Sequence, residues 1–257
     1  MDYGISLLSV IPLRAEPTDK SEIVNHILFG ELLEVVGKQE QWRKVRTVYD
    51  NYEGWLDGKQ ITPLKTEDFF ILGKAETPVT LDVVQIAVYD RNHMIPVVLG
   101  SSLPAFDGKK ISINSTDYFY EGNTRCGKVT DKKSVVENSF MYMNAPYLWG
   151  GRSPFGIDCS GFTQMVYKLC GIKLRRDAGQ QAEEGTTVHL LEEAEPGDLV
   201  FFDNEEGHIV HCGIILPGER IIHASGRVRI DKLDHHGIFN SETKKYSHHL
   251  RLVKRIF

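Results

Sequence analysis

The sequence lacks the features that mark several classes of protein. No run of basic residues is longer than three, and 30 Lys and Arg stand against 35 Asp and Glu, a net charge of −5. Proteins that bind nucleic acid or anionic membranes concentrate positive charge, so neither partner is expected. Uninterrupted apolar stretches, such as residues 69–72, are far too short to span a bilayer.

Cysteine is scarce, and no leader is visible. The four cysteines lie at positions 126, 159, 170 and 212, and none belongs to a Cys-x-x-Cys motif. So few cysteines do not suggest a disulfide scaffold, and we expect reduced thiols. The first residues show no basic segment followed by an apolar one, so no signal peptide is expected. These features predict a cytoplasmic protein, or a periplasmic or secreted one if a leader has been removed.

The composition that remains is that of a globular protein. Of 257 residues, 41% are hydrophobic and 25% charged, which excludes wholesale disorder. At roughly 150 residues per domain, this length gives about 1.7 domains. Eight of the ten histidines lie in the last 69 residues. This asymmetry suggests that the chemistry lies towards the end of the chain.

The first half of the chain is rich in strand patterns. Residues 31–36, 42–47 and 51–56 read as strands and turns, which predicts a small β-barrel over 1–63. Residues 79–88, 95–99 and 111–113 indicate further strands, and a second, more divergent barrel is expected over 64–130.

The sequence pattern changes from strand-like to helical near residue 131. Ser134 and Glu137 have the spacing of a capping box, and Phe140 and Met143 continue a helical period. A helix is therefore expected here, with a domain boundary near 130. The last domain, residues 131–257, adds helices to strands, so the fold class is α+β.

Cys159 lies where a second helix is expected to begin. Asp158 is a candidate N-cap, which places Cys159 in the first turn, and Gly171 is a natural stop. The free N–H groups and the dipole at a helix N-terminus stabilise an anion, so the thiolate of Cys159 is favoured. Taken alone, Cys159 is equally consistent with a structural role.

Two histidines, His211 and His223, are the candidate catalytic partners of Cys159. Residues 197–202, 208–216 and 220–225 read as three strands. A hairpin centred on Pro217 pairs His211 with His223 on one face, with Cβ atoms about 5 Å apart. His223 then fixes the tautomer of His211, which takes a proton from Cys159 as in a nucleophilic triad. By strand alternation, the Cys212 side chain is expected to face away from the site.

Metal and cofactor sites are not expected. His208 and His211 invite a zinc hypothesis, but on a strand they point to opposite faces. The sequence contains no P-loop, Gly-x-Gly-x-x-Gly, His-Glu-x-x-His or Gly-x-Ser-x-Gly motif. The remaining paired histidines are predicted to be exposed polar residues: His235, His236, His248 and His249.

Five motifs occur in order within some 80 residues: Tyr147-x-Trp149-Gly150-Gly151, Asp158-Cys159-Ser160-Gly161-Phe162, Gly197-Asp198-Leu199-Val200-Phe201-Phe202, His211-x-Gly213-Ile214 and His223-Ala224. Together they resemble the NlpC-type cysteine peptidases, papain-like enzymes that cleave bacterial cell-wall peptides. Within residues 1–63, the order Gly30, Trp42-x-x-Val45, Gly54-Trp55-Leu56 resembles the bacterial SH3-like domain. The resemblance implies a papain-like domain of helices packed on an antiparallel sheet, preceded by small SH3-like barrels.

The resemblance also implies roles for residues. By this resemblance, Cys159 is the nucleophile, His211 is the general base and His223 orients His211. The Cys159 N–H and the Tyr147 hydroxyl are the implied hydrogen-bond donors to the oxyanion. The combination with an SH3-like front resembles the γ-D-glutamyl-L-diamino acid endopeptidases, which release L-Ala-γ-D-Glu from murein peptides. The expected partner is thus a murein-derived peptide, and the implied substrate contacts are Trp149, Asp158, Ser160, Tyr52 and Glu16.

Two alternatives stay open at this point. The chain is also consistent with a cell-wall-binding module whose papain-like domain is inert, or with an amidase or acyltransferase on the same scaffold. Neither the third residue of the peptide (lysine or diaminopimelate) nor the oligomeric state is predicted.

Overall fold

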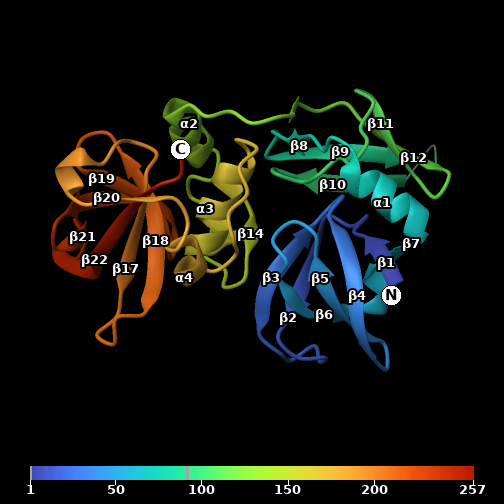
Figure 1. Cartoon of the computed structure of the whole chain (residues 1–257), viewed down its shortest axis with the longest axis horizontal. Helices are drawn as coiled ribbons and strands as arrows, with labels where there is room; N and C mark the ends of the chain where they lie inside the picture. The colour runs from blue at the N-terminus through green and yellow to red at the C-terminus, as the bar shows by residue number, and fades with distance from the viewer. Residues whose placement is uncertain (1, 91–92) are drawn as a thin grey trace. The chain divides into compact units, whose positions relative to one another are not determined.

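A computed structural model describes residues 2–90 and 93–257 of the chain (Figure 1). Packing divides it into two compact units. The first comprises Met1–Gly127 and Trp149–Pro154, and the second Lys128–Leu148 and Phe155–Phe257. The division at 127/128 lies close to the boundary expected near 130.

Residues 2–64 of the first unit form a seven-stranded antiparallel sheet in the order β3-β2-β6-β5-β4-β1-β7. Its strands are β1 (Asp2–Ile5), β2 (Val10–Arg14), β3 (Ile23–Leu28), β4 (Leu32–Gln39), β5 (Trp42–Thr47), β6 (Glu53–Asp57) and β7 (Thr62–Leu64), with a short 3₁₀ helix η1 (Gly58–Gln60). Its core consists of branched aliphatic side chains: Ile11, Leu13, Ile27, Leu33, Val45 and Leu56.

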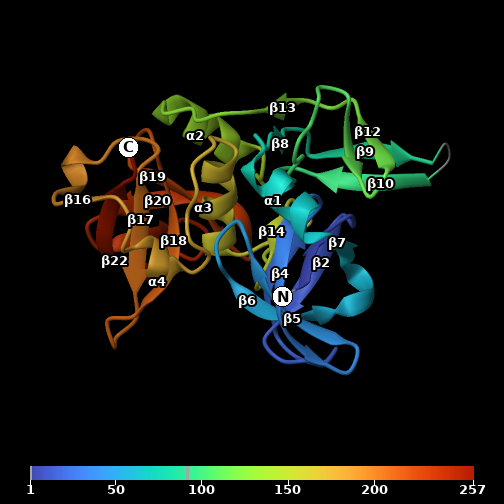
Figure 2. The same ribbon diagram turned by 45° about the vertical axis from the view of Figure 1, so that its right-hand side comes forward.

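Residues 66–125 add a helix and two further small sheets (Figure 2). The elements are α1 (Thr66–Lys74), β8 (Val79–Thr80), β9 (Val84–Tyr89), β10 (His93–Val98), β11 (Lys110–Ile113), β12 (Thr116–Tyr120) and β13 (Thr124–Arg125), joined in the orders β10-β9-β12-β11 and β13-β8. The strands expected over 79–88, 95–99 and 111–113 correspond to β8–β11, whereas β12, β13 and α1 were not predicted. Phe69 of α1 stacks on Tyr3 at 4.1 Å between ring centroids. Phe69 belongs to a core that includes Val97 and Ile111, and Tyr3 packs against that core. The two regions thus pack as one compact unit, and their division into two barrels stays a prediction.

The short strand β14 (Arg152–Ser153) also belongs to the first unit. The Arg152 guanidinium donates hydrogen bonds to both Glu31 carboxylate oxygens, at 3.0 and 3.1 Å, and to the His26 carbonyl at 2.9 Å. Arg152 and Glu31 are almost completely buried. This buried ion pair fastens the segment Trp149–Pro154 to the first unit.

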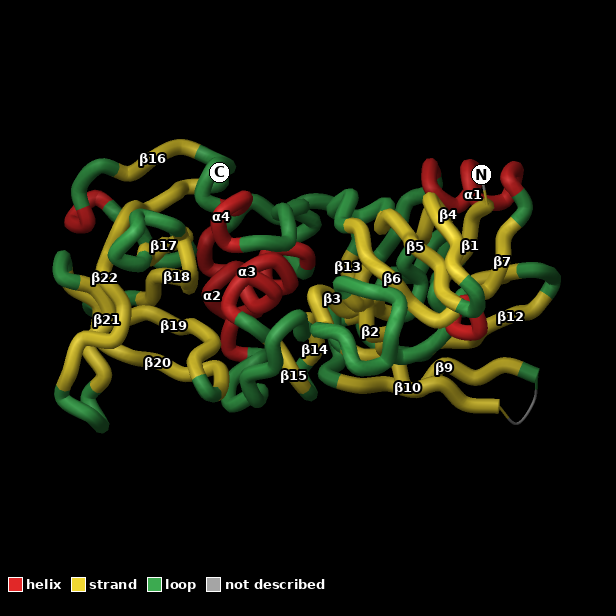
Figure 3. The backbone as a smooth tube through the Cα atoms, turned by 90° about the horizontal axis from the view of Figure 1, so that it is seen from below, coloured by secondary structure: helices red, strands yellow, loops and turns green. Residues whose placement is uncertain are grey.

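The second unit combines helices with a closed barrel (Figure 3). Its elements are α2 (Lys132–Phe140), β15 (Gly156–Ile157), α3 (Cys159–Lys168), α4 (Ala178–Gln181), β16 (Thr186–Val188), η2 (Leu191–Glu193), β17 (Leu199–Asp203), β18 (Ile209–Leu216), β19 (Arg220–Ser225), β20 (Arg227–Asp234), β21 (Gly237–Asn240) and β22 (Lys245–Arg255). Because β22 pairs with both β17 and β21, the six strands β17 to β22 close on themselves. One set of side chains, including Phe202, Ile215 and Leu233, packs together in a core, and α3 packs against β18 and β19.

The start of α2 corrects one expectation. Asp131 is the N-cap, and its carboxylate accepts from the Ser134 N–H at 2.9 Å and from the Ser134 hydroxyl at 2.6 Å. The predicted capping box at Ser134 is therefore wrong, because the stronger acidic acceptor three residues earlier takes that role. Among the described residues, no helix is long and apolar enough to cross a membrane.

Candidate active site

The predicted position of Cys159 at a helix start is confirmed. α3 begins at Cys159, and its N-cap Asp158 accepts from the Gly161 N–H at 2.7 Å. Phe162 and Met165 are completely buried, which holds the helix on the barrel. Cys159 is 6% exposed. Its side chain therefore lies in the field of the helix N-terminus, which favours the thiolate.

The two histidines come together, but in a different register from the one expected. β18 pairs with β19 so that Gly213, and not His211, lies opposite His223. The turn is responsible, because Gly218 and Glu219 both have positive φ, +78° and +54°, and three residues connect the strands. The predicted direct pairing of His211 with His223 is wrong. They are diagonal neighbours on one face, and Nε2 of His211 lies 2.8 Å from Nδ1 of His223.

Gly213 makes this diagonal contact feasible. A Cβ atom at position 213 would lie 2.9 Å from the Cβ of His223 and 2.7 Å from Cδ1 of Ile221. Both distances are shorter than ordinary van der Waals contact. The glycine therefore leaves the space that His223 occupies when it leans along the sheet towards His211.

Asp231 lies next to His223 and is not among the site residues predicted from the sequence. Its Oδ2 lies 3.1 Å from Nε2 of His223, and Arg229 donates to its Oδ1 at 2.9 Å. Burial raises the pKa of Asp231, but hydrogen bonds from His223 and Arg229 outweigh it, and the pKa lies below its ordinary value. The sequence held a signal, because a turn at Gly226 puts positions 223, 229 and 231 on one face of a hairpin.

The surroundings of the Cys159 thiol lower its pKa well below the ordinary value. The largest cause is a hydrogen bond from the Cys212 thiol; burial opposes it, and a hydrogen bond and the charge of His211 add to the lowering. The pKa of Cys212 is raised well above its usual range by burial and by the hydrogen bond to Cys159. Cys212 thus stays a thiol and acts as donor.

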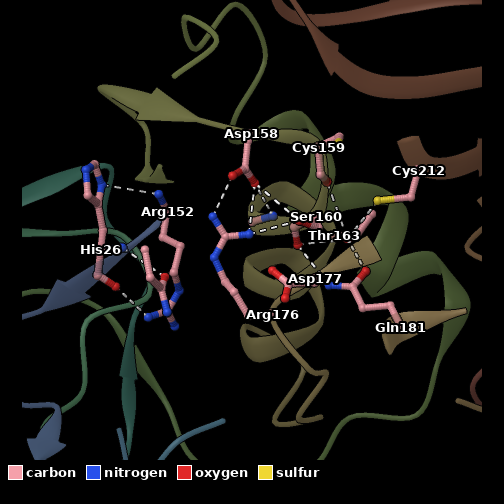
Figure 4. A network of polar contacts seen from close by, with 12 residues as sticks. His26, Arg152, Asp158, Cys159, Ser160, Thr163, Arg176, Asp177, Gln181 and Cys212 are labelled. Atoms are coloured by element: carbon pink, nitrogen blue, oxygen red, sulfur yellow. Dashed lines mark hydrogen bonds and ion pairs between the residues drawn. The ribbon is translucent and has the colours of Figure 1, made fainter. Parts of the chain in front are cut away.

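The expectation that Cys212 faces away from the site is therefore wrong. Its Sγ lies 3.6 Å from the Thr163 hydroxyl of α3, and Figure 4 shows its side chain pointing from the strand towards that helix. The strand is irregular here: Phe202 pairs with His211 but Asp203 pairs with Ile209, which leaves a β-bulge at Val210. Beyond this bulge, His211 and Cys212 pair regularly with Phe202 and Phe201, so their side chains point to opposite faces of β18. Cys212 faces α3, and the thiol of Cys159 at the start of that helix is hydrogen-bonded to both residues.

Asp158 and Ser160 are bound to a buried arginine that sequence reasoning missed (Figure 4). The Arg176 guanidinium donates to Oδ1 and Oδ2 of Asp158 at 3.0 and 2.5 Å, and to the Ser160 hydroxyl at 2.9 Å. Arg176 is 2% exposed. Asp158 therefore has two structural functions, as helix cap and as partner of a buried cation.

The other predicted contacts divide between the units. Tyr147 lies in the second unit and is 36% exposed. Burial and the nearby charge of Cys159 raise the pKa of its hydroxyl to about 12, so it keeps its proton at neutral pH. Trp149, Tyr52 and Glu16 belong to the first unit, and their roles at a substrate pocket stay predictions.

His248 corrects another expectation. Its ring stacks on the ring of His211 at 4.1 Å between centroids with 22° between the planes, so it is not a freely exposed residue. Burial, with the nearby charge of His223, lowers the pKa of His248 to about 4. His235, His236 and His249 are exposed, as predicted. Within residues 2–90 and 93–257, no cluster of His, Cys, Asp or Glu has the arrangement of a metal site.

A thiol at a helix N-terminus, hydrogen-bonded to an oriented pair of histidines, is the arrangement of a papain-like cysteine hydrolase. Comparison with known proteins agrees. Residues 144–248 match the model of the NlpC/P60 family, and residues 13–61 match that of the bacterial dipeptidyl-peptidase SH3 domain.

Similar proteins extend the match along the chain. It is 30% identical over 223 residues to the gamma-D-glutamyl-L-lysine dipeptidyl-peptidase of Bacillus subtilis, covering 79% of this chain and 72% of that protein. It is 28% identical to dipeptidyl-peptidase 6 of Lysinibacillus sphaericus, covering 90% and 92%. The crystal structure of an NlpC/P60 family protein from Bacillus cereus superposes with a TM-score of 0.82 at 20% identity, covering 99% of both chains. The chain belongs to the NlpC/P60 family and is a cysteine peptidase.

Proposed function

We propose that this peptidase hydrolyses the γ-D-glutamyl–L-diamino acid bond of murein peptides that carry a free N-terminal L-Ala. The observation that carries the proposal is the array of Cys159, His211 and His223, in which a thiol with a lowered pKa meets an oriented imidazole. The names of relatives that match most of the chain support the choice of bond, since these are gamma-D-glutamyl-L-lysine dipeptidyl-peptidases.

In the proposed reaction, the Cys159 thiolate attacks the carbonyl carbon of the γ-D-glutamyl bond. The oxyanion that forms accepts hydrogen bonds from the Cys159 N–H at the start of α3 and from the Tyr147 hydroxyl, which stays protonated at neutral pH. His211 gives its proton to the leaving amine, which leaves a thioester. His211 then takes a proton from water, and hydroxide attack on the thioester releases the dipeptide.

Asp158 and Ser160 are proposed to contact the ammonium end of the substrate, beside the nucleophile. Their arginine partner offsets the charge of the Asp158 carboxylate, so the contact is better described as a hydrogen bond to an oriented oxygen than as an isolated ion pair. This arrangement favours a small amine group that donates in a fixed direction.

The test is mass spectrometry of products from L-Ala-γ-D-Glu-L-Lys and from its N-acetylated form. We expect release of L-Ala-γ-D-Glu from the free peptide and little cleavage of the acetylated one. Cys159→Ala is expected to reduce turnover by more than about 10⁴-fold. Equal cleavage of both peptides would contradict the requirement for a free amine, and an active Cys159→Ala variant would exclude the thiol mechanism.

A further inference from the structure

Asp231 ends a line of hydrogen bonds that begins at the Cys159 thiol. Cys159 is hydrogen-bonded to His211, His211 Nε2 to His223 Nδ1 at 2.8 Å, and His223 Nε2 to Asp231 Oδ2 at 3.1 Å. The last three residues are buried, at 5%, 1% and 6% exposure. Bulk water therefore has little part in deciding which ring nitrogens carry protons.

The direction of these hydrogen bonds follows from Asp231. An ionised carboxylate accepts and cannot donate, and hydrogen bonds from His223 and Arg229 keep the pKa of Asp231 low. His223 must therefore donate from Nε2, which leaves Nδ1 as its acceptor. His211 then donates from Nε2, and its Nδ1 keeps the lone pair that faces the thiol.

We propose that Asp231, held by Arg229, is a positioning residue that sets the tautomers of both imidazoles and so makes Nδ1 of His211 the base. The inference rests on the proposed function for its catalytic consequence, but the tautomers and the ionisation of Cys159 are measurable without any peptide. The charged and titratable groups that face His211 are Cys159 from α3, His223 from β19 and His248 from β22.

Arg229 gives the proposal a distinctive consequence. It lies directly opposite His223 on β20, donates to Oδ1 of Asp231 at 2.9 Å, and places its Nε 2.8 Å from Oδ2. In Asp231→Asn, we expect the amide oxygen in the place of Oδ1, where the terminal guanidinium nitrogen donates to it, and the amide N–H₂ in the place of Oδ2, towards His223. His223 then accepts at Nε2 and donates from Nδ1, which forces the proton of His211 onto Nδ1.

The experiment compares Asp231→Asn with Asp234→Asn, a matched change on the same strand at a carboxylate that accepts from the Tyr246 hydroxyl and the His236 N–H. Three quantities are measured: the ring ¹⁵N shifts of His211 and His223, the alkylation rate of Cys159 against pH, and kcat and KM on the free tripeptide. For Asp231→Asn we expect exchanged tautomers, alkylation that begins at higher pH, and kcat lower by about 10² to 10⁴-fold with little change in KM. Asp234→Asn is expected to behave as the unmodified chain.

The double variant Asp231→Asn with Arg229→Met separates positioning from general damage. Without the guanidinium, the asparagine is free to turn its oxygen to His223, so we expect recovery of at least tenfold in kcat over Asp231→Asn alone. Unchanged tautomers and alkylation in Asp231→Asn, or no recovery in the double variant, would overturn the inference. A chain that cleaves no peptide, but in which Asp231→Asn still exchanges the tautomers, would refute the proposed function and leave the inference standing.

Discussion

Two bidentate pairs of arginine and carboxylate, Arg152–Glu31 in the first unit and Arg176–Asp158 in the second, have both side chains buried, and the two pairs differ in what they hold. Arg152 and Glu31 in the first unit are 0% and 2% exposed, and they fasten a peptide segment to a β-sheet. Arg176 and Asp158 in the second unit are 2% and 7% exposed, and the carboxylate also caps the helix that carries Cys159. The buried pair of the first unit thus contributes to stability alone, whereas the pair of the second unit also sets the charge beside the nucleophile Cys159.

The largest expected effect on stability comes from breaking the pair in the first unit. Arg152→Met leaves the buried Glu31 carboxylate without its cation, which costs about 3–5 kcal/mol of unfolding free energy. Urea unfolding followed by fluorescence measures the loss. Arg46→Met, which removes an exposed partner of Glu53 in the same unit, is the control and is expected to change the midpoint far less. Equal losses in both variants would show that burial does not distinguish these pairs.

Breaking the second pair is expected to change both stability and the thiol. Arg176→Met leaves the charge of Asp158 uncompensated, at a cost of about 3 kcal/mol, and the negative charge of Asp158 raises the pKa of Cys159. Alkylation of Cys159 should therefore begin at higher pH. The control is Arg175→Met, because Arg175 is the exposed neighbour and pairs with Glu183 and Glu184. An unchanged alkylation profile in Arg176→Met would remove the distinction drawn between the two units.

Cys212 is an uncharged neighbour of Cys159, so substituting it tests whether a charged residue is required to lower the pKa of the Cys159 thiol. Cys212→Val removes the hydrogen bond that contributes most to the low pKa of Cys159. We expect alkylation at pH 6 to slow about tenfold. Cys170→Val, at a buried cysteine that accepts from Asn138, should leave the rate unchanged. An equal effect of both substitutions would point to loosened packing and not to the thiol hydrogen bond.

The smallest effect is expected at His248, as a pH dependence of stability. Its pKa is about 4 in the folded chain and about 6.5 when unfolded. As pH falls from 6.5 to 4, the unfolded state binds a proton that the folded state does not, so the free energy of unfolding decreases. His248→Phe keeps an aromatic ring on His211 and should flatten this decrease in urea titrations. His249→Phe, at an exposed position, should retain it; parallel curves for His248→Phe and the unmodified chain would contradict the assignment.

Local patterns in the sequence predicted the parts of the site that local chemistry determines. The N-cap at Asp158, the helix carrying Cys159 and the strand containing His223 follow from neighbouring residues, and the structure places them as expected. The register of the hairpin could not be obtained in this way. It depends on Glu219 adopting a positive φ, which a non-glycine residue does infrequently.

The residues that were missed lie where distant segments meet. Arg176 and Arg175 are adjacent and alike in sequence, and nothing local indicates which one is buried. His248 and Leu250 of β22 both pack on the barrel core that includes Phe202, and this position follows from the closure of the barrel by β22, which is a long-range event. The same holds for Cys212, whose place beside Cys159 depends on the packing of α3 against β18.

The absence of a side chain at Gly213 suggests a rule for designing contacts between residues on neighbouring strands. Two side chains that sit diagonally on neighbouring strands are brought into contact when the residue directly opposite one of them has no side chain. A designer who wants two imidazoles to share a proton on a twisted sheet can therefore write His-x-Gly on one strand and place the second histidine opposite the glycine. In that pattern the missing side chain of the glycine, and not the choice of two histidines, determines how the two rings meet.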